Sequence, residues 1–439
     1  LEGRWVAGLF GQPHEEQIDA FIFTEREPYK PGETAHLFGV IRRELRQMEG
    51  AWLSTAALER SRTRLNRLGF FEVVNIETPQ VPGEGDLVDV DITVTERLSG
   101  SLQAGIGYGQ TQGVMFNISV QQDNVLGSGD RLGLTFNNSD INTVYSISYL
   151  DRYYTQSGIS RSLNVSYRET DAAEAELADY DTTAVNVGVG YSIPLSEVNS
   201  IQFGLALEQL ELRLGEFATQ TLSEFEAKYG NDFSAIKGTL GWVRDSRDRA
   251  IFPTRGGRQQ ISGEIALPGS DLEYYKVHYS HRRYWPLTQD LTFSIDLGIG
   301  YGDGYGNADE LPFFENFYAG GITSVRGYRG NSLGPRDRYE RTGREEPIGG
   351  NLRVVGSTEL IFPVPFSEIE SLRMLAFVDA GNVFDTREDV DWGELRYSAG
   401  VGLTWLSPLG ALTFSFARPL NDRAEDRTQV FQFSLGSLL

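Results

Sequence analysis

Residues 100–439 alternate between polar and apolar side chains with a period of two, in short segments separated by turn residues. This period is typical of β-strands, in which successive side chains point to opposite faces. About sixteen such segments are present, at roughly twenty residues per strand plus connection, and a strand needs about ten residues to cross a bilayer. The pattern therefore predicts a mainly β chain in which residues 99–439 form a sixteen-stranded antiparallel transmembrane β-barrel.

The two faces of the predicted strands differ in polarity. Along residues 372–380, Arg373 and Asp379 share one face, whereas Met374 and Val378 share the other. A polar lumen and an apolar lipid-facing side are what a membrane strand requires. A soluble β-sandwich would alternate equally, with its faces inverted, and is the alternative that the pattern disfavours.

Residues 43–98 have a different pattern, in which apolar residues recur at helix-like spacing from Leu45 to Leu68 and are followed by two short apolar runs. The order helix, helix, strand, strand predicts one small α/β module ahead of the barrel. Residues 1–42 are irregular and interrupted by prolines. We expect this N-terminal segment to be disordered or foreign to the module.

Composition narrows the class of protein. The mean hydropathy is −0.30, and no apolar run reaches the length of about 18 residues that a helical membrane anchor needs. The net charge of −22 disfavours nucleic-acid binding, because nucleic-acid phosphates attract basic surfaces. The absence of cysteine excludes disulfides, thiolate catalysis and Cys-ligated metal. The first residues show no leader pattern, so an exported protein would be expected here without its signal peptide.

Enzymatic chemistry finds no support in the residues. His278 and His281 are an odd number of positions apart on a predicted strand, so they face opposite sides and do not chelate one metal. Glycine-rich runs lie at strand ends rather than before helices, so they offer no helix N-terminus to a phosphate. We therefore expect no enzyme, no metal and no cofactor.

Several runs of residues carry a specific resemblance, and a Val-Arg-Gly-Tyr motif lies at residues 325–328, in a long predicted loop. The other runs are 42–53, 67–72, 121–129, 268–277, 314–321 and 407–410. From residue 42 onward the chain resembles the BamA family. These proteins are the central subunits of the outer-membrane β-barrel assembly machinery, in the Omp85 superfamily of barrels preceded by polypeptide-transport-associated (POTRA) modules. Residues 21–36, in contrast, resemble a fragment of bacterial α2-macroglobulin.

The resemblance implies an outer-membrane insertase that assists folding and membrane insertion of β-barrel outer-membrane proteins. It implies a barrel in the bacterial outer membrane, a POTRA module lacking its first strand at residues 43–98 in the periplasm, and a long inward loop at residues 302–349. The partners implied are unfolded β-barrel clients, accessory lipoproteins of the assembly complex and outer-membrane lipids. The alternatives are a secretion or autotransporter-assembly relative of the same superfamily and a passive diffusion porin.

The candidate loop anchor centres on Arg326. Its guanidinium keeps its charge inside a barrel, so an inward loop must bring it to carboxylates. Asp379 and Glu359 fall on lumen-facing positions of neighbouring predicted strands and are reasonable partners. Solvated charges in a wet lumen are the alternative. With the family motifs, the predicted anchor comprises Val325, Arg326, Gly327, Tyr328, Glu359, Phe377, Asp379 and Gly381.

The candidate lateral gate joins the first and last barrel strands. Residues 101–109 carry glycine at alternate positions, which either weakens strand pairing or relieves curvature. The resemblance implies that this edge and residues 429–436 form a gate to which client strands add by β-augmentation. The predicted gate residues are Gly105, Gly107, Gly109, Phe431, Phe433 and Gly436.

The candidate partner-binding residues lie at the start of the α/β module. Arg42, Arg46 and Glu49 are predicted on or near one helix face. The resemblance implies that they hold an accessory lipoprotein. A solvated charged helix face is the alternative.

Overall fold

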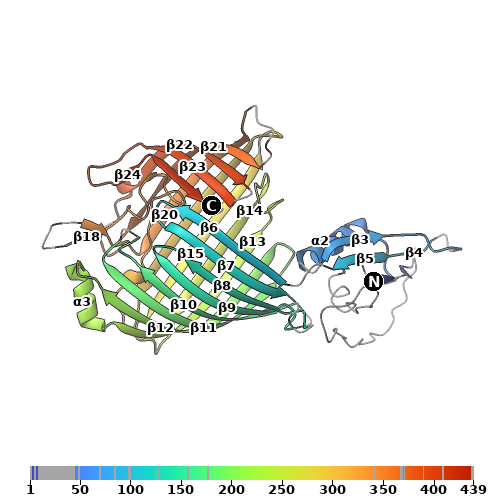
Figure 1. Ribbon diagram of the computed structural model, residues 1–439, viewed down its shortest axis with the longest axis horizontal. Coiled ribbons are helices and arrows are strands. Elements are labelled where there is room, and N and C mark those ends of the chain that lie inside the picture. Colours follow the sequence, from blue (N-terminus) through green and yellow to red (C-terminus); the bar gives the residue numbers. More distant parts are fainter. Residues whose placement is uncertain are drawn as a thin grey trace. The chain divides into compact units, whose positions relative to one another are not determined.

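The structure is a computed structural model, and it describes residues 2–3, 6–7, 45–47, 50–68, 71–83, 86–96, 100–123, 125, 128–155, 158–175, 177–339, 343, 345–365, 369, 371–388, 390–407 and 410–436. The chain divides into two compact units, residues 1–102 with 120–133, and residues 103–119 with 134–439. Figure 1 shows the ribbon with its elements labelled. In the described ranges, no helix is both long and apolar enough to cross a membrane.

The small α/β module packs helix α2 (Thr55–Leu68) against an antiparallel sheet of strand order β1-β5-β3. Its strands are β1 (Glu2–Gly3), β3 (Phe71–Glu77) and β5 (Asp91–Glu96), and a separate pair joins β2 (Val6–Ala7) to β4 (Val88–Asp89). The Ser54 hydroxyl accepts a hydrogen bond from the Ala57 amide at 3.3 Å, which caps α2. Leu65 of α2 is fully buried, as are most of Phe71 and Ile92 of the sheet. The strand β1 comes from the N-terminal segment, and the predicted domain limits at 42/43 and 98/99 stay predictions.

The first of the two predicted helices is wrong for its described residues, because residues 45–47 and 50–54 are not helical. Gly50 adopts a φ of 73°, in the left-handed region that ends a regular helix. The Gln47 side chain donates to the Trp52 carbonyl at 3.1 Å and accepts from the Ser54 amide at 2.9 Å. These bonds hold the run as a turn that leads into α2.

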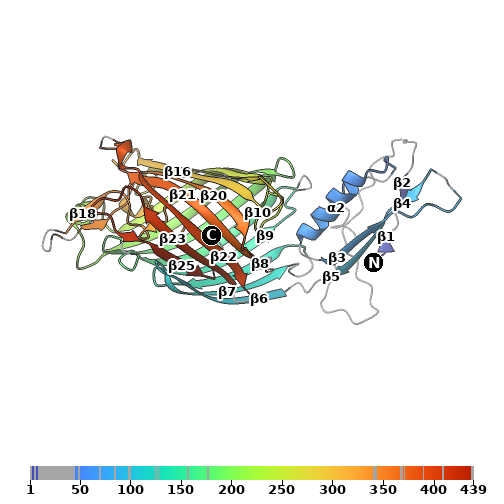
Figure 2. The ribbon, with the colours of Figure 1, turned by 90° about the horizontal axis from the view of Figure 1, so that it is seen from above.

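Sixteen antiparallel strands form a closed barrel, which confirms the predicted fold class. In chain order the strands are β6 (Gly100–Gly109), β7 (Gly113–Asp123), β8 (Arg131–Asn138), β9 (Asn142–Asp151), β10 (Ser160–Asp171), β11 (Tyr180–Pro194), β12 (Asn199–Leu214), β13 (Asp232–Asp245), β14 (Gly256–Ala266), β15 (Tyr274–Pro286), β16 (Thr292–Gly304), β20 (Leu352–Pro363), β21 (Leu372–Phe384), β22 (Arg396–Ser407), β23 (Gly410–Pro419) and β25 (Phe431–Leu435). Figure 2 shows the red β25 beside the blue-green β6, where the wall closes.

Alternation decides which side chains point into the barrel. On β12, Leu205 and Leu207 are 55% and 61% exposed, whereas the intervening strand position, Ala206, is less exposed. On β21, Val378 is 51% exposed while its neighbours Phe377 and Asp379 are buried. An apolar outer surface with polar groups inside is the arrangement that a lipid environment requires.

The connection between β16 and β20 is the inward loop, residues 305–351. It contains the short helix η2 (Phe313–Glu315) and strands β17 (Gly327–Tyr328), β18 (Arg336–Arg338) and β19 (Glu345–Pro347). Strand β17 pairs with β24 (Thr428–Gln429), which precedes β25, and η3 (Trp392–Glu394) lies between β21 and β22. The loop therefore runs inside the wall and reaches the last strands.

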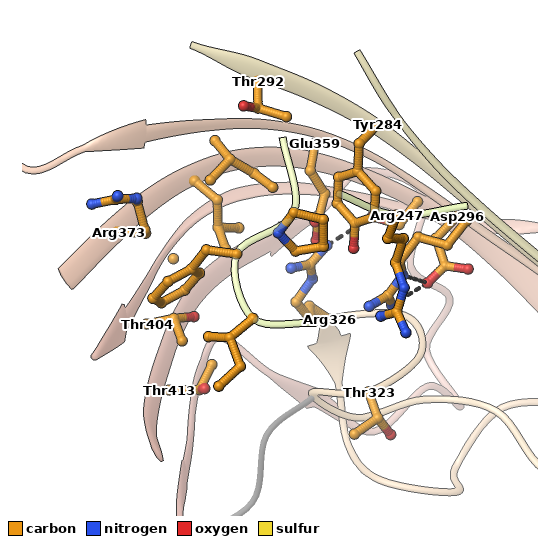
Figure 3. A pocket seen from close by; sticks show the side chains of 18 of the residues that line it. Arg247, Tyr284, Thr292, Asp296, Thr323, Arg326, Glu359, Arg373, Thr404 and Thr413 are labelled. Atoms are coloured by element: carbon orange, nitrogen blue, oxygen red, sulfur yellow. Dashed lines mark hydrogen bonds and ion pairs between the residues drawn. The ribbon is translucent and has the colours of Figure 1, made fainter. Parts of the chain in front are cut away.

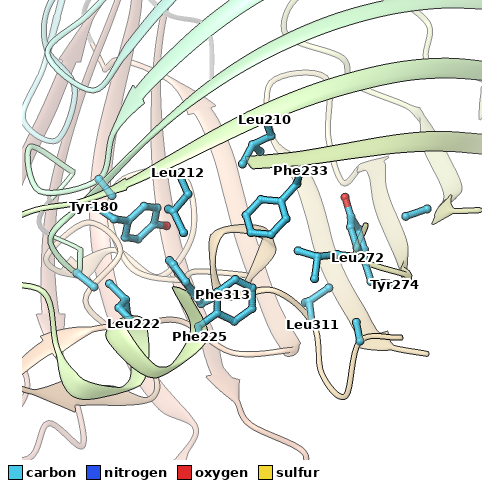
Figure 4. Close-up of a cluster of buried hydrophobic side chains, with 14 residues drawn as sticks. Tyr180, Leu210, Leu212, Leu222, Phe225, Phe233, Leu272, Tyr274, Leu311 and Phe313 are labelled. Carbon is cyan, nitrogen blue, oxygen red and sulfur yellow. The ribbon is translucent and has the colours of Figure 1, made fainter. Parts of the chain in front are cut away.

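One end of the barrel is filled by an apolar cluster around the start of this loop. Helix α3 (Gln220–Tyr229) contributes Leu222 and Phe225, and the Phe225 ring lies edge-on to Phe313 of η2 at 5.0 Å between centroids. Figure 4 shows these side chains gathered among residues of the surrounding strands. Burial of these aromatic rings fixes the entry of the loop, because apolar surface removed from water stabilises the fold.

Candidate functional site

Arg326 of the inward loop is 7% exposed and meets the barrel wall through two carboxylates. Its Nε and Nη2 donate to the two Asp379 oxygens, each at 2.7 Å, and Nη2 lies 2.9 Å from Glu359 Oε1. The backbone amide of Arg326 also donates to Asp379, at 3.0 Å. Burial alone would lower the pKa of the Arg326 guanidinium, but Asp379 and Glu359 outweigh it and raise the pKa above its ordinary value.

Neighbouring wall residues complete this contact. The Arg326 guanidinium lies over the Phe377 ring at 3.5 Å from its centroid, a cation–π geometry. Asp379 itself is fully buried and accepts a hydrogen bond from the Ser357 hydroxyl at 2.6 Å. A Cβ on Gly381 would lie 3.0 Å from Val325, so glycine there leaves room for the loop.

The second half of the motif binds the last barrel strands. Gly327 has a φ of 92°, a conformation that glycine adopts without strain, and a Cβ there would lie 3.2 Å from Ala417 of β23. The Gly327 amide donates to the side-chain oxygen of Gln432 at 3.2 Å, and the Gln432 amide donates back to the Tyr328 carbonyl at 2.7 Å. Tyr328 is fully buried. The structure therefore brings together all eight residues of the predicted loop anchor and adds Gln432 of β25.

A second ionic contact holds the loop to β13 and β15, a different part of the wall. Glu315 of η2 lies 2.8 Å from the Lys276 ammonium and 3.1 Å from that of Lys237. Its Oε1 also accepts a hydrogen bond from the Tyr274 hydroxyl at 2.8 Å. Lys237 in turn lies 2.7 Å from Glu208. Burial would raise the pKa of Glu315, but Lys276 and Lys237 hold it well below the ordinary carboxyl value.

Sequence reasoning did not single out Glu315 or Gln432. The available signal was the charge at lumen-facing positions of nearby strands, namely Glu208 on β12, Lys237 on β13 and Lys276 on β15. This charge did not indicate a particular loop residue, because the alternation along a strand does not predict which position of a loop contacts that strand.

Strands β25 and β6 close the barrel through a short ladder. Within the described residues they pair at Ser434–Gly109 and Leu435–Tyr108, and no further pair is formed. Elsewhere in the wall the ladders are long, as between β11 and β12, which pair from Tyr180–Leu214 to Pro194–Ser200. On the outer face, the rings of Tyr108 and Phe433 stack at 5.4 Å between centroids.

Next to the two backbone pairs, the side chain of Gln110 bonds to the edge of β25. The amide of Phe433 donates to Gln110 Oε1 at 3.1 Å, and Gln110 Nε2 donates to the Phe431 carbonyl at 3.5 Å. The glutamine therefore bonds the free edge of β25 as a neighbouring strand would. A side chain with rotatable bonds is displaced more easily than a continuous backbone ladder.

The predicted gate glycines differ in their surroundings. A Cβ on Gly107 would lie 2.7 Å from the Leu435 carbonyl oxygen, and one on Gly436, whose φ is 89°, would lie 3.0 Å from the Gly107 Cα. Glycine at these two positions permits a close backbone approach at the seam. Gly105 has open space around it, and Gly109 makes only ordinary contacts with Gln112.

Among the cavities that border the loop, one lies beside its anchor and one beside the seam. One, of about 460 Å³, lies beside the Arg326 contact and is lined by charged wall residues, among them Arg247, Asp296 and Glu359, as Figure 3 shows. The other, of about 290 Å³, lies between the loop and the seam and is lined by Gln110 and Gln432. The seam is therefore backed by open space rather than by packed side chains.

Of the predicted partner-binding residues, only Arg46 lies within the described ranges. Its backbone amide donates to the Ser61 hydroxyl at 2.7 Å, and its Nη1 donates to the Leu45 carbonyl at 3.2 Å. Arg42 and Glu49 lie outside the described residues. Binding of a lipoprotein at these positions stays a prediction.

Comparisons with known proteins agree with this architecture. Residues 124–438 match the Omp85 superfamily domain, and residues 39–97 match a POTRA domain described as a surface antigen variable number repeat. The chain is 37% identical over 433 residues to the outer membrane protein assembly factor BamA of Neisseria meningitidis, a match that covers 91% of this chain and 54% of that protein. It is 27% identical to BamA of Nitratidesulfovibrio vulgaris, over 90% of this chain and 49% of that protein.

Solved structures show the same arrangement. BamA from Haemophilus ducreyi lacking POTRA domains 1–3 matches with a TM-score of 0.77 at 33% identity, over 90% of this chain and 80% of that one. CdiB from Acinetobacter baumannii, at 15% identity and a TM-score of 0.56, shares the fold.

A closed barrel carrying an inward loop, with a POTRA module at residues 39–97, defines an Omp85-type protein of the outer membrane. The chain belongs to the Omp85 superfamily and, within it, to the BamA family. It spans about half the length of the curated relatives that it matches. The barrel is accordingly located in the outer membrane, and the POTRA module in the periplasm.

Proposed function

We propose that this chain is the barrel-bearing part of an outer-membrane insertase, which assists folding and insertion of β-barrel outer-membrane proteins through a lateral gate between β25 and β6. The main support for this proposal is the strand pairing at the seam between β25 and β6. Among the described residues its backbone pairing extends over two residue pairs, and the edge of β25 beyond them is bonded to the Gln110 side chain. An edge with unpaired or weakly paired backbone groups is a template for an incoming strand.

The inward loop supports the gate from inside. Gln432 binds the backbone of Gly327 and Tyr328, so the last strand is tied to the loop, and Arg326 ties the loop to β21. Parting of β25 from β6 therefore leaves β25 attached to the interior. Gly107 and Gly436 permit the close backbone approach that closes the seam after a client has left.

The proposal requires no cofactor, nucleotide or catalytic group. Burial of client side chains in lipid and pairing of client strands supply the free energy, because an unpaired backbone in a bilayer costs several kcal/mol per group. The partners proposed are unfolded barrel clients, outer-membrane lipids and accessory lipoproteins bound through the POTRA module.

A disulfide across the seam tests the proposal. The chain contains no cysteine, and Tyr108 and Leu435 face each other directly on neighbouring strands, at the spacing that a disulfide bridges. The double variant Tyr108→Cys/Leu435→Cys is reconstituted in liposomes and assayed for the folding of an added barrel client. We expect oxidation to abolish the acceleration of client folding and reduction to restore it.

A matched control introduces a disulfide between two neighbouring strands of the wall that lie away from the seam. Val187 and Leu207 are direct partners on β11 and β12. Val187→Cys/Leu207→Cys is expected to assist folding equally when oxidised and reduced. Undiminished client folding with the seam oxidised would refute the lateral gate. A large steady conductance unaffected by either lock and by Arg326→Ala, without any assisted folding, would identify a diffusion porin instead.

A further inference from the structure

The outer face of β13, β14 and β15 carries polar groups that the insertase mechanism does not use. These three strands are consecutive in the wall. Arg244 on β13 is the direct partner of Gln259 on β14, and Gln259 is the direct partner of His281 on β15. Arg283 lies two residues beyond His281 and therefore on the same face. We call these four residues the outer polar patch.

The neighbours of these residues show that the patch faces away from the lumen. Lys237 and Thr239, at odd positions of β13, contact lumen groups or line a lumen cavity, while Ile236 and Leu240, at even positions, are exposed. Arg244 shares the even face. The ladders from β12 to β16 run without a register shift, so no bulge reverses this alternation.

The side chains of β15 alternate in the same way. Its even positions His278, Ser280 and Arg282 line the lumen cavity, and Arg282 is paired there with Asp296 at 2.6 Å. His281 and Arg283 therefore point to the opposite side, which faces lipid. Arg283 is exposed, and so is Arg244.

The patch lies toward the periplasmic end of the wall. Strand β6 follows the periplasmic module along the chain and therefore begins at the periplasmic side, and up-and-down connections bring the eighth strand, β13, and the tenth, β15, back to that side. Arg244 is next to the last residue of β13, and Arg283 lies three residues before the end of β15. Trp285, beyond Arg283, is exposed, as aromatic residues of an interfacial girdle are. The patch is thus at the level of the inner-leaflet headgroups.

Both arginines lack an anionic partner in the described part of the chain. Arg244 makes no ion pair or hydrogen bond there, and Arg283 makes a single cation–π contact, with the Trp285 ring at 5.8 Å. The Arg283 stem lies beside Gly257, its direct partner on β14, where a Cβ would be 3.0 Å from the Arg283 Cδ.

Between the arginines, a hydrogen-bond donor is held in place. The Gln259 side-chain nitrogen lies 2.8 Å from His281 Nδ1. Since an amide nitrogen can only donate, Nδ1 is the acceptor and the ring proton of a neutral His281 sits on Nε2. The patch therefore offers two guanidinium groups and an imidazole N–H, with no carboxylate among them.

A comparison within the barrel shows that this arrangement is local. Arg161, also on the outer face near the periplasmic end, is paired with Asp151 at 3.5 Å and lies over the Tyr154 ring. At the opposite end of the strands, outer-face positions include the acidic residues Glu211 and Asp232. An anionic ligand is thus repelled at that end and attracted to the outer polar patch.

We propose that the outer polar patch binds the phosphate of an anionic phospholipid from the periplasmic leaflet, with Arg244 and Arg283 as the phosphate ligands and His281 as a third donor. Arginine suits this ligand because its planar fork matches phosphate oxygens and because phosphate neutralises a charge that lipid-facing positions otherwise disfavour. Trp285 and Leu240 flank the site and contact glycerol and acyl groups. The site holds a lipid against the wall on strands that take no part in the seam.

Native mass spectrometry of the folded chain in detergent tests this proposal. The protein is titrated with phosphatidylglycerol and, separately, with phosphatidylcholine of the same acyl chains. We expect one phosphatidylglycerol molecule to bind at least about tenfold more tightly than phosphatidylcholine, and Arg244→Gln/Arg283→Gln to remove this preference. A large excess of inorganic phosphate is expected not to displace the lipid, whereas displacement would show a site for free phosphate and overturn the lipid assignment.

Arg161→Gln is the matched control, because it removes an outer-face arginine that already has a partner. It is expected to keep the preference for phosphatidylglycerol. If Arg161→Gln lost the preference for phosphatidylglycerol as fully as Arg244→Gln/Arg283→Gln, net charge alone would explain the effect, and the proposal would be contradicted. Should the double variant fail to fold, Arg244→Lys/Arg283→Lys keeps the charge but loses the planar fork. It is expected to bind phosphatidylglycerol more weakly than the unchanged chain, and unchanged binding would overturn the assignment of the arginines.

Discussion

The inward loop and the seam are attached to the wall in opposite ways. The loop is held by ion pairs at two places, a buried one through Arg326 on β20 and β21 and a partly buried one through Glu315 on β13 and β15. In the part of the seam that the structure describes, β25 and β6 share two residue pairs, a bonded glutamine and a stacked aromatic pair. Breaking a buried ion pair at one partner costs about 3–5 kcal/mol, whereas a single hydrogen bond contributes about 1 kcal/mol.

This difference indicates where the barrel opens. Separation of β25 from β6 breaks few bonds, whereas release of the loop leaves buried charges without partners. The wall therefore opens at the seam, and the inward loop stays bound to the wall. Gln432, which binds both the loop motif and β25, connects the strong attachment with the weak one.

The largest expected effect comes from removing the strongest loop contact. Arg326→Ala leaves Asp379, which is fully buried, without its counter-charge and should lower the free energy of unfolding by about 3–5 kcal/mol. Urea denaturation monitored by tryptophan fluorescence measures this change. Arg338→Ala, at an exposed position of the same loop, is the control and should cost less than about 0.5 kcal/mol. Equal losses in the two variants would contradict the anchor.

Hydrogen exchange compares the seam directly with an ordinary ladder. Amides of β25 should exchange at least about 100-fold faster than those of β12, a difference of ~2.7 kcal/mol in opening free energy. Mass spectrometry after deuterium labelling of the folded chain resolves the two strands as separate peptides. Similar protection in both would mean that the seam is as closed as the rest of the wall.

The second loop contact should be weaker than the first. Glu315→Gln keeps the shape of the side chain but removes its charge, and Lys237 still has Glu208 at 2.7 Å. We expect a loss of about 1–3 kcal/mol in urea denaturation, because a hydrogen-bonded charge is lost in a buried site. Glu216→Gln, at an exposed loop position, is the control. A loss larger than that of Arg326→Ala would reverse the order of the two contacts.

Substitution of Gln110 should weaken the seam. Gln110→Ala removes two hydrogen bonds to the backbone of β25 and should make seam opening easier by about 1 kcal/mol. Faster exchange of the Phe433 amide, with β12 unchanged, is the expected observation. Gln112→Ala alters a nearby exposed side chain and should leave the Phe433 amide unaffected.

The smallest effect is expected from mild acidification. Because the pKa of Glu315 is held well below the ordinary carboxyl value, its contribution to stability is present above that value, about 4.3, and is lost only as the pH falls through the depressed one. Channel conductance in planar bilayers should therefore be the same at about pH 7 and pH 5 if the loop alone governs it. A reversible rise in conductance at pH 5 that Glu315→Gln abolishes would contradict this expectation.

Much of the architecture follows from local alternation. A period of two over residues 100–439 predicts the strands, and parity alone places Glu359 and Asp379 on the lumen side, where Arg326 reaches them. The same reasoning fails where the backbone departs from a regular element. Gly50 and the bonds of Gln47 turn a run with helical spacing into a turn, because these contacts outweigh a weak spacing signal.

The barrel, its lumen-facing positions and the family resemblance are thus readable from the residues alone, since all three depend on local periods and short motifs. The contacts of Glu315 with Lys237 and Lys276, and of Gln432 with the loop, emerge only once the chain is folded. The same holds for the short closing ladder among the described residues and for the placement of Arg244 and Arg283 on one face of neighbouring strands. These contacts join segments far apart in the chain. They depend on strand register and on the path of a long loop, which no local pattern specifies.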